Sequence, residues 1–238
     1  MFLDVSHNYI WRRIKIIHMK KLPDKETERL LRKYKIPFPE HVLTKSEDSA
    51  VRAAKRIGFP VAMKVSSPDI LHKTDAGCVI LDVRDEEGVR KAYRQIIRNA
   101  RKNKQRARIE GVSVEEMIPE GTREVIIGAK QDPQFGPVLM FGLGGIFVEV
   151  LKDVSFGVVP LERGDAAEMV REIRGFRILE GVRGQKPVNM RLLEMTIMKV
   201  SRMVWENSGK GKRIQELDIN PLFIDEKNVW AADVRVLV

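Results

Sequence analysis

Hydrophobic positions recur with two different periods along this chain, and the two periods predict helices and strands in a definite order. Between residues 21 and 110 the pattern predicts helices near 24–36, 46–57 and 89–100 and strands at 60–65 and 78–83. From residue 111 it predicts strands at 112–117, 123–130, 136–141, 146–150 and 155–159, then helices near 164–173 and 189–206. Mixed helices and strands in this order indicate an α+β protein.

The change of pattern predicts three segments. Residues 1–20 show no clear period, and Met19 is a candidate for the true start, so we expect this stretch to be an extension that is disordered. Residues 21–110 form a predicted small lobe and residues 111–238 a predicted large lobe. Ligands often bind in clefts between such lobes, which makes a cleft here the expected binding site.

The end of the chain combines two oxygen-bearing side chains with a predicted strand pair. Residues 216–222 and 229–233 are predicted to be neighbouring strands joined by a turn at 225–228. Asn220 and Asp233 would then face a common point. Mg²⁺ that carries nucleotide phosphates takes few protein oxygens and completes its shell with phosphate and water. A polar hairpin without any ligand explains the same residues equally well.

Three more side chains are candidates for contact with a nucleotide. Lys64 follows the apolar run 59–63, so its ammonium would emerge where a buried strand meets a loop and could meet a phosphate. A lysine that merely extends to solvent from a strand end is the alternative. Glu116 and Glu124 flank the turn at 119–121 and could offer carboxylates to ribose hydroxyls or a metal, although surface glutamates at strand ends are common.

Two loop features complete the candidate chemistry. His72 lies in the polar loop 66–77, where a neutral imidazole could attack phosphorus and carry a phosphoryl group, or could simply be an exposed histidine. Residues 142–145, Gly-Leu-Gly-Gly, could let a backbone approach a phosphate or could be a glycine-rich hairpin. They match neither the Walker pattern nor the strand-to-helix dinucleotide fingerprint.

Composition narrows the classes of protein. The chain has 238 residues, of which 43% are hydrophobic and 32% charged, which is typical of a globular protein. No apolar run approaches the roughly 18 residues that cross a bilayer, so we expect no membrane association. Residues 1–20 lack the apolar core of a signal peptide. The single cysteine, Cys78, excludes an intrachain disulfide and fits a reducing compartment, so we expect a cytoplasmic protein.

The formal net charge of +10 raises a nucleic-acid alternative. Residues 90–108 hold nine basic and no acidic side chains. However, Val89, Ala92, Ile96 and Ala100 recur there at helical spacing, so the basic residues read as the solvated face of a helix. The run also lacks the interleaved aromatic residues of single-strand binders. Nucleic acid is therefore an unfavoured partner.

Taken in order, six segments resemble the ATP-grasp fold, and most closely the β subunit of the ADP-forming acetyl-CoA synthetases, or acetate-CoA ligases, of archaea. The resemblance covers residues 21–238. The segments are GFPVAMK (58–64), DILHKTDAG (69–77), VEEM (114–117), REVIIG (123–128), FGLGG (141–145) and DINPL (218–222).

The resemblance implies a two-lobed ATP-grasp fold that binds ATP or ADP with Mg²⁺. It implies that Lys64 contacts phosphates, that Glu116 and Glu124 line the nucleotide site, and that Asn220 and Asp233 hold the metal. It further implies that His72 relays a phosphoryl group between an acyl phosphate and ADP. The implied partner is an α subunit that carries CoA-binding and phosphohistidine domains, in a hetero-oligomer. A synthetase for another acid, such as succinate, remains an alternative.

Overall fold

The computed structural model describes residues 19–70, 73–145, 151–182, 184–209 and 214–238. The predicted strand at 146–150, nearly all of the predicted extension at 1–20, and His72 lie outside these ranges. The chain divides into two compact units: a small unit, residues 39–119, and a large unit, residues 1–38 together with 120–238. In the described ranges, no helix is both long enough and apolar enough to cross a membrane.

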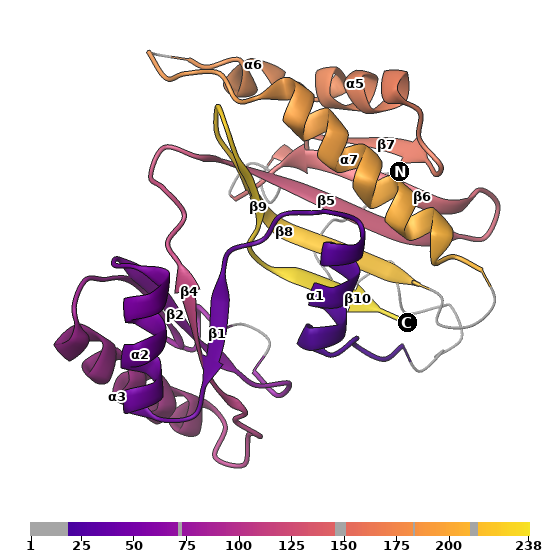
Figure 1. The fold of residues 1–238 in the computed structure, drawn as a ribbon. Helices are drawn as coiled ribbons and strands as arrows, with labels where there is room; N and C mark the ends of the chain where they lie inside the picture. Colours follow the sequence, from indigo (N-terminus) through magenta and orange to yellow (C-terminus); the bar gives the residue numbers. More distant parts are fainter. Residues whose placement is uncertain (1–18, 71–72, 146–150, 183, 210–213) are drawn as a thin grey trace. The chain divides into compact units, whose positions relative to one another are not determined.

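The small unit is an antiparallel sheet with α-helices packed on one face (Figure 1). Its sheet has the strand order β1-β4-β2-β3. Val61, Met63 and Val65 of β2 point toward the helices and are buried, whereas the alternate residues point to the other face. The elements are β1 (His41–Thr44), α2 (Glu47–Ile57), β2 (Val61–Ser66), β3 (Val79–Val83), α3 (Glu86–Asn103) and β4 (Gly111–Glu116).

The predicted limits of α2 are confirmed by its caps. The Ser46 hydroxyl accepts a hydrogen bond from the Ser49 N–H at 3.2 Å, and the Ser49 hydroxyl lies 3.0 Å from the Ser46 N–H, as in a capping box. Gly58 ends the helix with a φ of 101°, a conformation that favours glycine.

The large unit contains an antiparallel sheet of order β10-β8-β5-β6-β7, with β9 also paired to β8. Helices α5 and α7 lie on one side of this sheet and enclose the core with it (Figure 1). The elements are α1 (Asp24–Lys33), β5 (Arg123–Asp132), β6 (Gly136–Leu143), β7 (Val154–Val158), α5 (Arg163–Glu172), α6 (Phe176–Leu179), α7 (Met190–Glu206), β8 (Glu216–Ile224), β9 (Val229–Ala231) and β10 (Val234–Leu237).

The boundaries of the units differ from the predicted lobes, 21–110 and 111–238, at both ends. Helix α1 belongs to the large unit because Leu31 and Tyr34 are buried in its core. Strand β4 belongs to the small unit because it pairs with β1 and β2. Both assignments depend on partners far away in sequence, which the local pattern does not contain. The short elements β1 and α6 were also not predicted.

Candidate functional site

Asn220, in the middle of β8, lies opposite Asp233 in the sheet of the large unit. The Asn220 N–H donates a hydrogen bond to the Asp233 carbonyl oxygen at 3.0 Å. The predicted strand pair is confirmed, since β8 pairs with β9 across the turn at 225–228. Asp233 itself lies in the break between β9 and β10 instead of within a strand. Both residues are exposed, so their side-chain oxygens are accessible to a ligand.

The strand alternation explains which way this site faces. Leu217 and Ile219 of β8 are fully buried in the core, so Asp218 and Asn220 point to the opposite face of the sheet. On that face the Arg235 guanidinium lies 2.9 Å from the Glu216 carboxylate and 4.0 Å from that of Asp218. An arginine therefore offsets part of the negative charge beside the Asn220–Asp233 pair.

The chemistry of this pair fits Mg²⁺. An amide oxygen and a carboxylate oxygen are the hard donors that this ion prefers, and it usually takes one or two carboxylates with water or phosphate as the other ligands. Within the described ranges, no group of three or more His, Cys, Asp and Glu side chains is arranged so that it could hold a metal ion. Asn220 and Asp233 remain the metal-binding residues that we predict.

Lys64 lies in β2 of the small unit, and its ammonium contacts a carboxylate that the sequence analysis did not single out. The Lys64 Nζ lies 2.6 Å from the Glu115 Oε2, and the two side chains are only 22% and 13% exposed. The strand register accounts for the contact, because Lys64 is opposite Ser113 and Glu115 is opposite Ala62. The sequence does indicate that residues 113 and 115 share one face of a strand, because side chains alternate. It does not indicate that this face meets Lys64, because the register between the two strands is set by the tertiary structure.

Glu116 is the last residue of β4. Because side chains alternate along a strand, it points to the face of the sheet opposite that of Glu115. Its N–H donates to the Glu40 carbonyl oxygen at 2.8 Å, and its Oε2 accepts from the Glu40 N–H at 3.2 Å. These bonds fix the residue that precedes β1 to the end of β4. The predicted role of Glu116 at a nucleotide therefore involves a carboxylate that already has a backbone partner in this structure.

Glu124, the second residue of β5, is exposed and lies against the glycine-rich segment after β6. Its carbonyl oxygen accepts a hydrogen bond from the Gly144 N–H at 2.8 Å. A Cβ atom on Gly144 would lie 3.0 Å from the Glu124 Cβ, and one on Gly145 would lie 3.2 Å from the Glu124 Oε2. The two glycines thus permit the chain to pass directly beside Glu124, a packing requirement that explains them without a phosphate.

The loop that contains His72 is described at both of its ends. On one side, the Asp69 Oδ2 accepts a hydrogen bond from the Arg108 N–H at 2.7 Å, and the Lys104 Nζ lies 3.6 Å from its Oδ1. On the other side, the Asn99 amide donates to the Gly77 carbonyl oxygen at 2.6 Å. The hydrogen bond from Arg108, supported by the charges of Lys104 and Arg108, holds the pKa of Asp69 below its ordinary value.

The basic helix α3 has acidic neighbours on α2. The Arg90 guanidinium lies 2.7 Å from the Asp48 carboxylate, and that of Arg94 lies 3.0 Å from the Glu47 carboxylate. Val89, Ala92, Ile96 and Ala100 are buried, as the helical spacing predicted. These contacts neutralise part of the basic run and weaken the nucleic-acid alternative.

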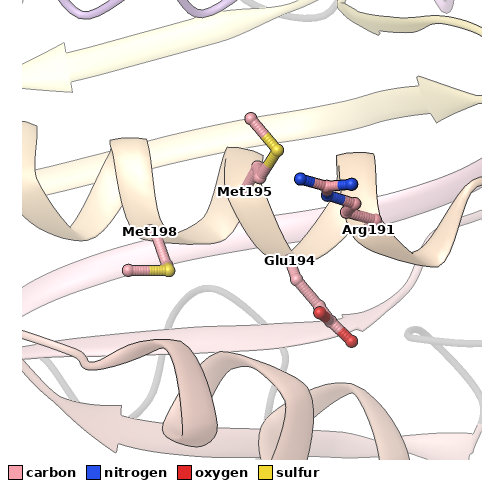
Figure 2. Close-up of a pocket in the computed structure, with 4 residues that line it drawn as sticks. All are labelled: Arg191, Glu194, Met195 and Met198. Atoms are coloured by element: carbon pink, nitrogen blue, oxygen red, sulfur yellow. The ribbon is translucent and has the colours of Figure 1, made fainter.

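A pocket of about 110 Å³ lies on α7 and is lined by Arg191, Glu194, Met195 and Met198. Figure 2 shows these side chains spread along the helix rather than converging on one point. Its volume is close to that of a few water molecules and well below the 300–1,000 Å³ of ordinary ligand sites. We therefore do not regard it as the functional site.

Comparison with known proteins places these residues in a family. The family model described as ATP-grasp domain matches residues 18–238. The chain is 47% identical to the acetate–CoA ligase [ADP-forming] I subunit beta of Pyrococcus furiosus over 92% of both proteins. It is 42% identical to the 4-hydroxybutyrate–CoA ligase [ADP-forming] of Nitrosopumilus maritimus, over 95% of this chain but only 32% of that protein.

Solved structures agree with this assignment. The dinucleotide-forming acetyl-coenzyme A synthetase 1 of Ca. Korarchaeum cryptofilum, in complex with coenzyme A, Ca-AMPCP and HgCl⁺, matches with a TM-score of 0.87 and 42% identity over 92% of this chain and 93% of that one. A second structure of that enzyme holds coenzyme A and Mg-AMPPCP, with its phosphohistidine segment pointing towards the nucleotide binding site. It matches at 38% identity and a TM-score of 0.78, over 92% of this chain and 93% of that one. The expected fold is confirmed, and the chain belongs to the ATP-grasp family, in the branch that contains the β subunits of ADP-forming acetate–CoA ligases.

Proposed function

We propose that this chain is the nucleotide-binding subunit of an ADP-forming acyl-CoA synthetase, with acetyl-CoA, ADP and phosphate converted to acetate, ATP and CoA. The observation that carries the proposal is the 47% identity to a protein named as a β subunit, which extends over 92% of both chains. The pair of oxygen donors at Asn220 and Asp233, held by a backbone hydrogen bond, supports it.

In this function each candidate residue has a separate task. Lys64 neutralises phosphate charge, which matters because phosphoryl transfer depends mainly on positioning and electrostatic stabilisation. Glu124 and Glu116 contact the nucleoside part. Asn220 and Asp233 hold Mg²⁺, which supplies further charge neutralisation when it is bound.

His72 is the proposed carrier of the phosphoryl group. Its imidazole nitrogen attacks the phosphorus, and a P–N bond forms as the bond to the departing oxygen breaks. In the second half-reaction, a terminal oxygen of ADP attacks, a P–O bond forms, the P–N bond breaks, and the imidazole leaves as the neutral ring. The hydrogen bonds of Asp69 and Asn99 support this role, because they hold both ends of the loop to which the histidine belongs.

The partner is proposed to be an α subunit that binds CoA and selects the acid. Relatives named for acetate and for 4-hydroxybutyrate share 47% and 42% identity with this chain. The chain corresponds to nearly the whole of the first but to about a third of the second. This supports the view that the acid is selected by a region outside the part that the two relatives share with this chain. That region would be a separate subunit beside the acetate relative and a part of the same chain in the 4-hydroxybutyrate relative. A synthetase for another acid is therefore the second candidate function.

The test is a phosphorylation assay with labelled ATP and Mg²⁺, carried out with the chain alone and with a candidate α subunit. We expect label on the chain that is stable in alkali, labile in acid and removed by ADP. Assays of the reconstituted complex with acetate, succinate and 4-hydroxybutyrate then distinguish the two candidate functions. Absence of label under both conditions would contradict the proposal.

A further inference from the structure

The ion pair between Lys64 and Glu115 lies on the face of the small unit's sheet that is opposite its helices. Lys64 and Ala62 of β2 alternate with the buried residues Met63 and Val65, so they share that other face. Glu115 reaches that face from β4, two residue pairs along the ladder from the Lys64–Ser113 pair. The contact of 2.6 Å is therefore a diagonal cross-strand pair between two adjacent strands.

The partial burial of this pair needs an explanation beyond stability. An ion pair that is removed from water gains little net free energy, because the cost of desolvating both charges offsets their attraction. Two apolar residues at the same positions would stabilise the sheet at least as well. The ion pairs between α2 and α3 are more exposed to solvent than this one. Such exposed pairs change the stability of a protein little in either direction. A lysine held at a fixed point, with part of its surface still open to solvent, is suited to meeting an anion.

We propose that Glu115 is a positioning residue for the phosphoryl transfer: it holds the Lys64 ammonium at the point where that group meets the nucleotide phosphates. This inference rests on the proposed function. A lysine side chain has four rotatable bonds, and ordering it has an entropic cost that a fixed partner removes in advance. Glu115 thus holds the Lys64 ammonium in place before the reaction. The ammonium can then stabilise the charge of the transferring group in the transition state without having to move.

The inference has a specific kinetic signature. Glu115→Ala removes the partner, so the rate of transfer from phosphohistidine to ADP should fall about tenfold, with a smaller change in the KM for ADP. Glu115→Gln keeps an oxygen that accepts the hydrogen bond from Lys64, so its rate should return to within about threefold of the wild type. Glu115→Asp withdraws the carboxylate by one methylene, and its rate should lie between these two.

A double-mutant cycle tests whether Glu115 acts through Lys64. Lys64→Met alone should slow the transfer, and addition of Glu115→Ala to Lys64→Met should slow it no further. Glu110→Ala is the matched control, because Glu110 precedes β4 and pairs with Arg108 at 3.3 Å, outside the Lys64 contact. Single-turnover transfer in the complex with the α subunit is the measurement, and thermal melting verifies that each variant is folded.

The outcomes separate this inference from the proposed function. A wild-type rate for Glu115→Ala, failure of Glu115→Gln to restore the rate, or an equal loss from Glu115→Ala in the Lys64→Met background would each overturn the positioning role. If Glu115→Ala does not fold, the Gln and Asp variants carry the same test. A wild-type rate for Lys64→Met would overturn both this inference and the assignment of Lys64, and lack of transfer in the wild-type complex would overturn the proposed function.

Discussion

The backbone of Asn220 is joined to that of Asp233 by a hydrogen bond of 3.0 Å, although the two residues are separated by a strand and a turn. The bond fixes the spacing of the two side chains on one face of the sheet. Because the backbone already holds both residues, a substitution that removes only a side-chain oxygen should leave the hairpin intact. Their role can therefore be tested without loss of the fold.

Asp233→Ala should weaken Mg²⁺-dependent binding of ADP by about tenfold or more, because it removes a carboxylate from the predicted metal site. Calorimetric titration with ADP, in the presence of Mg²⁺ and in EDTA, checks this. Glu226→Gln is the control, since Glu226 lies in the same hairpin turn and pairs with Lys186 at 2.7 Å. Unchanged affinity in Asp233→Ala would remove this residue from the metal site.

His72→Ala should abolish the acid-labile label and the synthesis of ATP, while nucleotide still binds. The reason is that the imidazole is the proposed carrier of the phosphoryl group, whereas affinity comes from other residues. Phosphorylation with labelled ATP and calorimetry on the same preparation check both parts. Normal turnover by the reconstituted variant would refute the assignment of His72.

Asp69→Asn should lower thermal stability at neutral pH, and the difference from the wild type should shrink in acid. The folded-state pKa of Asp69 is lowered by the Arg108 N–H and then by Lys104, so the ionised form stabilises the fold above the ordinary pKa. That contribution is lost as the pH falls below about 4 and through the lowered pKa. Melting temperatures of both proteins at pH 7 and pH 3 check the sign.

Asp75→Asn serves as the control for this pH dependence, because Asp75 is an exposed aspartate of the same loop. The Asp75→Asn variant should have the same melting temperature as the wild type at pH 7 and at pH 3. A stability difference for Asp69→Asn that stays constant from pH 7 to pH 3 would show that the carboxylate charge is not the cause.

Gly144→Ala should destabilise the large unit by about 1–3 kcal/mol, the usual cost of forcing an extra carbon into a packed site. The new Cβ would lie 3.0 Å from the Glu124 Cβ and 3.1 Å from its carbonyl carbon. Gly164→Ala is the matched control, because it lies in α5 with open space around the added carbon. That variant should be neutral or up to about 1 kcal/mol more stable. Urea unfolding checks both values, and equal stability of the two variants would contradict the packing argument.

Several features of the fold could be predicted because their physical causes are local. The amphipathic spacing in α3 and α7 and the caps at Ser46 and Gly58 act over a few residues, so the pattern of residues contains them. The hairpin between β8 and β9 was predictable for the same reason. Strand β1 was missed because its four residues pair only with β4, some seventy residues later.

The sequence by itself determined which side chains are available for chemistry and, through the order of its motifs, which family they resemble. Only the tertiary structure decided that Glu115, and not Glu116, meets the Lys64 ammonium, and that Gly144 passes directly beside Glu124. The physical reason is that side-chain direction in a strand follows from local alternation, whereas the identity of the neighbour depends on strand register. Register is set by the pairing and packing of the whole sheet, which is a property of many distant residues at once.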